Sequence, residues 1–149
     1  MPTPPLEPGF EIVHFMLSYY DGILECVADC RGAPHHFQLE DRGAPDEPRD
    51  RYRLTHLSPE AFAAFVDGWN IWCRWEAAYR AGRVAPHLGP NPALPGDLSR
   101  QREADVVVTA WISAARPTSF CALGEFKPLL QNVNAGTARG ALQVLWTLE

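Results

Sequence analysis

The first 57 residues constrain the fold most, because they contain four strand-forming segments separated by turn signals. β-Branched and aromatic residues dominate the first segment, FEIVHFMLSYY, and the Asp21-Gly22 pair that follows favours a two-residue hairpin loop. Gly32-Ala33-Pro34 predicts the next reversal, and a turn-rich acidic loop at 41–50 predicts another. We therefore expect strands at residues 10–20, 23–31, 35–40 and 51–57.

A long helix is predicted directly after these strands. Ser58 can cap the free amides of its first turn, and Pro59 suits the first helical position. Glu60 complements the positive end of the helix dipole, and Gly82 provides the stop. The helix is expected over residues 59–81.

A second helix is predicted after a stiff connection. Residues 82–97 contain four prolines, which exclude both a helix and a central strand there. Asp97 can cap a helix that continues to residue 115 and stops before Pro117. The apolar spacing is helical, although the run at 106–109 would also suit a strand.

The last part of the chain predicts a closing hairpin. Residues 118–130 and 141–148 have strand character around a loop at 131–140. The expected fold class is α+β, with a largely antiparallel sheet in the order β-β-β-β-α-α-β-β and two helices packed on the sheet. Residues 1–9 are expected to be a flexible proline-rich tail, and residues 10–149 a single α+β domain.

Composition and charge favour a small soluble domain of acidic character. The chain has 149 residues and a net charge of −5, and its basic residues do not cluster, which argues against a nucleic-acid partner. No export signal or membrane-spanning run is visible, so a cytoplasmic location is expected. Lys127 is the only lysine beside twelve arginines, a bias typical of a GC-rich bacterial genome.

The four cysteines are expected to be reduced and mostly buried thiols. Cys26 and Cys30 fall in one predicted strand, where four residues span about 13 Å, too far for one disulfide or one shared metal ion. Cys73 and Cys121 are distant in the sequence and have no spacing typical of a metal site. No cofactor is predicted.

The expected hairpin registers predict which side chains share a face of the sheet. A loop at residues 21–22 and a second at 32–33 would keep the apolar side chains on one face of the sheet. The pairs that result are Tyr20 with Ile23, His14 with Asp29, Ala28 with Phe37, and Cys26 with Leu39.

The opposite face would then show His14, Asp29 and His36 in one row. Two imidazoles beside a carboxylate could bind a metal ion or share a proton. A cross-strand ion pair beside a solvated or core-lining histidine is the simpler interpretation, because such pairs are common on sheets. Zinc would also need a further ligand, and no nearby residue supplies one.

The first predicted helix is unusually aromatic. Its apolar stripe includes Trp72, and Trp75 widens the stripe beyond half of the circumference. Glu76 and Arg80 lie one turn apart within it, in the favourable order for an ion pair. Either both side chains are solvated beyond the end of the sheet, or Trp72, Trp75, Glu76 and Arg80 form a recess for a small ligand or an anchor for a partner.

Two classes of function remain open from the sequence. No phosphate-binding loop, zinc-protease motif or nucleophile elbow is present, so no catalytic residue is assigned. The first hypothesis is a small acidic cytosolic binding module that acts by affinity for a protein partner, as toxin-neutralising or accessory proteins do. The net charge of −5 favours a basic partner. The alternative is a small enzyme or metal-dependent protein that uses the row of His14, Asp29 and His36 or the recess around Glu76.

Overall fold

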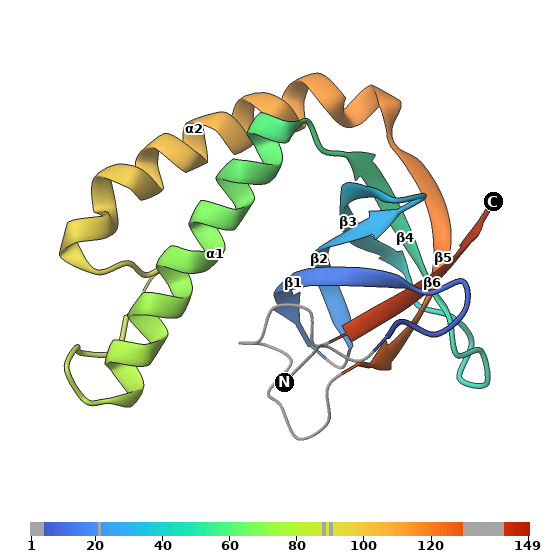
Figure 1. Ribbon diagram of the computed structural model, residues 1–149, viewed down its shortest axis with the longest axis horizontal. Coiled ribbons are helices and arrows are strands. Elements are labelled where there is room, and N and C mark those ends of the chain that lie inside the picture. The colour runs from blue at the N-terminus through green and yellow to red at the C-terminus, as the bar shows by residue number, and fades with distance from the viewer. Residues whose placement is uncertain (1–4, 21, 88, 90, 130–141) are drawn as a thin grey trace. The chain divides into compact units, whose positions relative to one another are not determined.

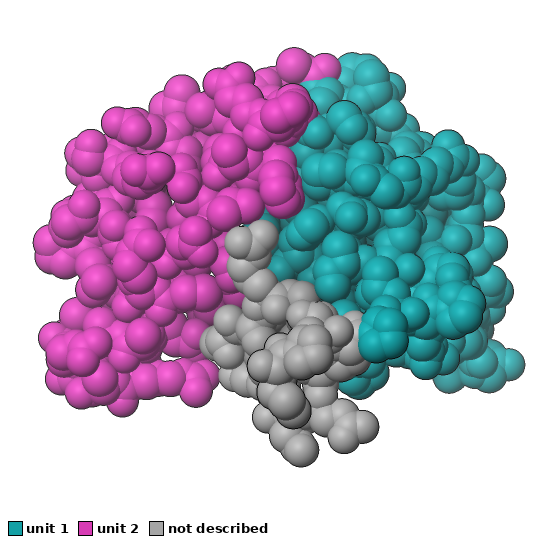
Figure 2. Space-filling view, viewed as in Figure 1, with its two compact units in different colours: residues 1–57, 115–149 teal, residues 58–114 magenta. Residues whose placement is uncertain are grey.

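The protein forms six β-strands and two long α-helices, which divide into two compact units. The computed structural model describes residues 5–149 except 21, 88, 90 and 130–141. Unit 1 contains residues 1–57 and 115–149, and unit 2 contains residues 58–114 (Figure 2). Unit 2 is therefore an insertion in the chain between the fourth and fifth strands.

Unit 1 is a closed antiparallel barrel of six strands (Figure 1). Each strand pairs with its neighbours in chain order, and the last strand pairs with the first. A barrel of this kind has no free strand edge. The strands are β1 (Glu11–Tyr19), β2 (Ile23–Cys30), β3 (Ala33–Asp41), β4 (Asp50–His56), β5 (Phe120–Pro128) and β6 (Leu142–Leu148).

The predicted fold class, an α+β sheet covered by two helices, is wrong. β1 and β6 pair at three positions, so the sheet closes on itself instead of presenting one face to helices. The pairing of β1 with β2 also shifts at three places along the strand, and such bulges bend and twist a strand as closure requires. The predicted strand and helix segments nevertheless lie within two residues of those observed.

An aromatic cluster is part of the hydrophobic core of unit 1. The ring of Phe37 lies 5.1 Å from that of Trp146 and 5.3 Å from that of Tyr52, both edge to face. Phe126 completes the cluster at 5.6 Å from both Phe37 and Tyr52. Edge-to-face packing adds to the free energy gained by burying these rings. The aromatic cluster therefore joins side chains from four strands of the barrel, and the core as a whole contains residues of all six.

Two aromatic side chains of the cluster also donate hydrogen bonds to backbone carbonyls of β2. The Tyr52 hydroxyl donates to the carbonyl of Ile23 at 2.9 Å, and the indole Nε1 of Trp146 donates to that of Asp29 at 3.0 Å. Burial raises the pKa of Tyr52, so the hydroxyl remains a donor. β4 and β6 are thus linked to a strand with which neither pairs.

The two hairpin turns of β1–β3 differ from the predicted ones. Tyr19, not Tyr20, pairs with Ile23, so the first loop has three residues; its residue 21 lies outside the described part of the chain. The second loop is Arg31-Gly32, whose φ angles of 56° and 77° are both positive, as a type I′ turn requires. The predicted β2–β3 register is therefore wrong, and the predicted β1–β2 register is kept only at the pair of Ser18 with Glu25.

Unit 2 contains two α-helices that run in opposite directions (Figure 1). The first is α1 (Pro59–Arg80), and the predicted cap is confirmed, since the amide of Ala61 donates to Ser58 Oγ at 3.1 Å. The second is α2 (Leu98–Ala115), preceded by a short 3₁₀ helix, η1 (Pro95–Asp97). Both carboxylate oxygens of Asp97 accept hydrogen bonds from Arg74 of α1, each at 2.9 Å. This ion pair links the start of α2 to α1.

The remaining segments add little regular structure. A second 3₁₀ helix, η2 (Arg116–Thr118), leads from α2 into β5. The predicted loop at 131–140 lies outside the described residues. Among those that are described, no helix is both long and apolar enough to span a bilayer.

Replacing Gly124 with alanine should destabilise the barrel. Gly124 pairs with Trp146 across β5 and β6, and an added Cβ would lie only 2.7 Å from Cζ3 of that indole. Because the ring is held within the aromatic cluster, we expect Gly124→Ala to lower the free energy of unfolding by about 1–3 kcal/mol in urea denaturation.

Gly68→Ala is the matched control for this substitution. A Cβ at Gly68, inside α1, meets no atom within 4 Å, so alanine should raise stability by up to about 1 kcal/mol through helix propensity. Equal effects of the two substitutions would contradict the packing of Trp146 over Gly124.

Candidate functional site

Two histidine–carboxylate pairs form on strands β1–β3 of the barrel. His14 Nε2 lies 2.7 Å from Oδ1 of Asp29, and His36 Nε2 lies 2.8 Å from Oε1 of Glu25. The side chains of His14 and Asp29 are 20% and 24% exposed, and that of His36 is 11% exposed. The predicted contact of His14 with Asp29 is therefore present, but His36 has a different carboxylate partner.

The predicted cross-strand pairing of Asp29 with His36 is not formed, because the register of β2 with β3 differs from the expected one. The turn at residues 31–32 shifts β3 by two positions, so His36 pairs with Val27 and Asp29 pairs with Pro34. In addition, β1 has a register irregularity between Val13 and Phe15, at the position of His14. Likewise Ala28 pairs with His35 instead of Phe37, and Cys26 with Phe37 instead of Leu39.

A third carboxylate supports the turn beside the first pair. The two oxygens of Glu11 accept hydrogen bonds from the amides of Arg31 and Gly32, at 3.0 and 2.7 Å. This contact stabilises a loop in which a non-glycine residue, Arg31, adopts a positive φ. Within the described part of the chain, no three His, Cys, Asp or Glu side chains gather in a way that could hold a metal ion.

A further histidine contact joins His35 of β3 to His56 of β4. His35 and His56 face each other, with ring centroids 5.2 Å apart in an edge arrangement, and Phe120 lies 5.7 Å from His35. Nδ1 of His35 is 2.8 Å from the carbonyl oxygen of Ala33. Burial lowers the pKa of His35, and the nearby His56 acts in the same direction.

His35 should make the protein less stable at acidic pH. Its pKa is lowered in the folded state, so the unfolded chain binds a proton first as the pH falls below the ordinary histidine value of about 6.5. The free energy of unfolding should therefore decrease between about pH 7 and 5. In His35→Gln this decrease should be smaller, as measured by urea unfolding at a series of pH values. An identical slope in both proteins would contradict the assignment.

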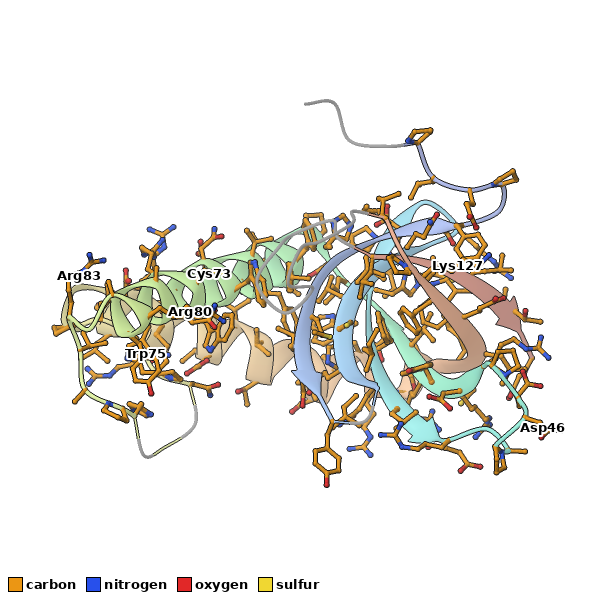
Figure 3. All side chains as sticks on the ribbon, turned by 90° about the horizontal axis from the view of Figure 1, so that it is seen from below. Asp46, Cys73, Trp75, Arg80, Arg83 and Lys127 are labelled. Carbon is orange, nitrogen blue, oxygen red and sulfur yellow. The ribbon has the colours of Figure 1, made fainter. Side chains whose placement is uncertain are left out.

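The C-terminal end of α1 carries an ordered aromatic surface within unit 2. The rings of Trp75 and Tyr79 stack with centroids 5.2 Å apart and planes only 7° from parallel. His87 approaches Trp75 edge-on at 6.3 Å. Arg80 donates to Glu76 at 2.9 Å, and the exposed fractions of these side chains are 62% and 17%. Figure 3 labels Trp75 and Arg80 on this helix. We call these five residues the Trp75 surface.

The four residues of the predicted recess take part in three contacts. Trp75 stacks on Tyr79, Glu76 pairs with Arg80, and Trp72 stacks on the buried Trp69 at 5.3 Å.

A shallow groove in unit 2 lies elsewhere, between α1 and α2. Its lining residues are Glu60, Ala63, Ala64, Asp67, Arg100, Glu103, Ala104 and Val107.

Two members of the Trp75 surface were not among the predicted site residues. Tyr79 lies four positions after Trp75 in the sequence, and i,i+4 spacing on a helix could have identified it. His87 comes from the proline-rich connection, where no periodic pattern relates a side chain to α1. Its contact with Trp75 depends on the path of that connection.

The cysteines are free, as expected. Cys26 and Cys30 are buried in the barrel, while Cys73 and Cys121 are partly exposed. Burial raises the pKa of both Cys26 and Cys30, which keeps these thiols protonated and poorly nucleophilic at neutral pH. The two buried cysteines therefore serve packing rather than thiolate chemistry.

Comparison with protein-family models, curated proteins and solved structures finds no match for this chain. A functional proposal must therefore be supported by the chemistry and geometry of its own residues.

Proposed function

We propose that this protein is a binding module that acts by affinity for a protein partner, and that the Trp75 surface is its anchor. The observation that supports this proposal is the stack of an exposed tyrosine, Tyr79, on the partly buried Trp75, next to Arg80 in the sequence. Tyr79 is 43% exposed while its ring stacks on Trp75. Tryptophan, tyrosine and arginine are the residues most enriched among those that contribute most to protein binding.

Preordering of the Trp75 surface favours tight association. Each ring is held by another ring, and the Arg80 guanidinium is held by Glu76. Side chains that are already ordered lose less conformational entropy when a partner covers them. The Glu76 carboxylate also keeps Arg80 paired if the surface becomes desolvated, so that no isolated charge is buried.

Electrostatics favour a partner of net positive charge. The chain has a net charge of −5. Unit 1 has twelve acidic residues against eight basic ones, whereas unit 2 has six against five. Long-range attraction of a basic protein would increase the association rate and would weaken as salt is added. Short-range affinity would come from the neutral rings of the Trp75 surface.

Trp75→Ala should abolish partner capture. The wild-type protein and the variant are immobilised and exposed to an extract of the native host, and bound proteins are quantified by mass spectrometry. The genuine partner should be retained by the wild type and should bind the variant at least about 30-fold more weakly, because loss of a central tryptophan typically removes about 2 kcal/mol or more. The affinity of the purified partner is then measured by calorimetry at two salt concentrations.

Tyr20→Ala provides a matched control for loss of an exposed aromatic residue. Tyr20 is 73% exposed and lies in unit 1, outside the proposed anchor. The control variant should therefore bind like the wild type. If no captured protein distinguishes Trp75→Ala from Tyr20→Ala, the proposed function is overturned.

A further inference from the structure

Helix α2 presents apolar side chains to solvent along one side. Leu98, Val106 and Ile112 are 41%, 69% and 41% exposed, and they are three of the seven large hydrophobic residues that are exposed in the described chain. At 100° per residue they fall within about 120° of the helix circumference. Thr109, which is also exposed, lies between them.

The same stripe contains one cation and one anion. Arg102 and Asp105 are both exposed and lie between the apolar positions on the helical wheel. Among the described residues, neither forms an ion pair. The neighbouring Arg100 shows the contrast, because it points to α1 and lies 3.4 Å from a carboxylate oxygen of Asp67.

We propose that this stripe pairs with the same stripe of a second copy, with the two α2 helices antiparallel. A two-fold axis between residues 103 and 104 would place Arg102 of each copy opposite Asp105 of the other. Leu98 would then face Thr109 of the second copy and lie within one turn of its Ile112. The two charges thus become two symmetric ion pairs, flanked on each side by Leu98 of one copy and Ile112 of the other.

The charges favour this arrangement over its alternatives. A parallel pair in register would place Arg102 beside Arg102 and Asp105 beside Asp105, and like charges in contact oppose association. The antiparallel pair is isologous, so both copies use the same stripe. The dimer is therefore closed, and no stripe is left to bind a third copy. The stripe is also distinct from the Trp75 surface, so dimerisation does not depend on the proposed function.

Charge reversal distinguishes loss of this pairing from misfolding, because a mixture of two misfolded variants would not regain the dimer. Arg102→Asp alone would place two aspartates opposite each other twice, and Asp105→Arg alone would do the same with arginines. Each variant should associate at least about 100-fold more weakly than the wild type. An equimolar mixture of the two variants should restore the dimer, because one chain would then carry acidic side chains at both positions and the other chain basic ones.

Sedimentation velocity from about 1 to 500 µM measures these equilibria. Arg83→Asp reverses an exposed charge outside α2 and should dimerise like the wild type. A wild type that stays monomeric over this range would overturn the proposal and indicate that a different molecule covers the stripe. Single variants that dimerise like the wild type, or a mixture that stays monomeric, would overturn it as well.

Discussion

The pairing of β1 with β6 is the constraint on which the barrel depends. Three residue pairs, Glu11 with Val144, Ile12 with Gln143 and Val13 with Leu142, join segments more than 125 positions apart and remove both free edges of the sheet. Trp146 of β6 then packs against Phe37 and donates to a carbonyl of β2. Closure and core packing therefore stabilise each other, because the strand that completes the barrel also brings its largest ring to the core.

Function is proposed for the inserted unit and not for the barrel core. The aromatic cluster packs that core. Each of the two histidine–carboxylate pairs on β1–β3 has its own carboxylate, and the described residues form no group that could hold a metal ion. Unit 2 instead displays its most unusual side chains on its surface: the Trp75–Tyr79 stack on α1 and the stripe of α2 that holds Arg102 and Asp105. Two helices with separate exposed features would allow one chain to dimerise and to bind a partner at the same time.

Local signals in the sequence predicted the elements but not their assembly. The helix start at Ser58-Pro59 and the ion pair of Glu76 with Arg80 depend on neighbours along the chain, and both could be predicted. Barrel closure depends on pairing between distant strands, which no local pattern records. The predicted pairing of Asp29 with His36 is wrong for a local reason: Arg31 occupies a positive φ that favours glycine, and this moves the turn by one residue and the register of β3 by two.

Nuclear Overhauser contacts across β1 and β6 test the account most directly. If the barrel is closed, the backbone protons of Ile12 should show cross-strand contacts to those of Gln143, and the paired amides of both strands should exchange slowly with solvent. Rapid exchange along both strands, with no contact between them, would show an open sheet with two free edges and would contradict the closed barrel.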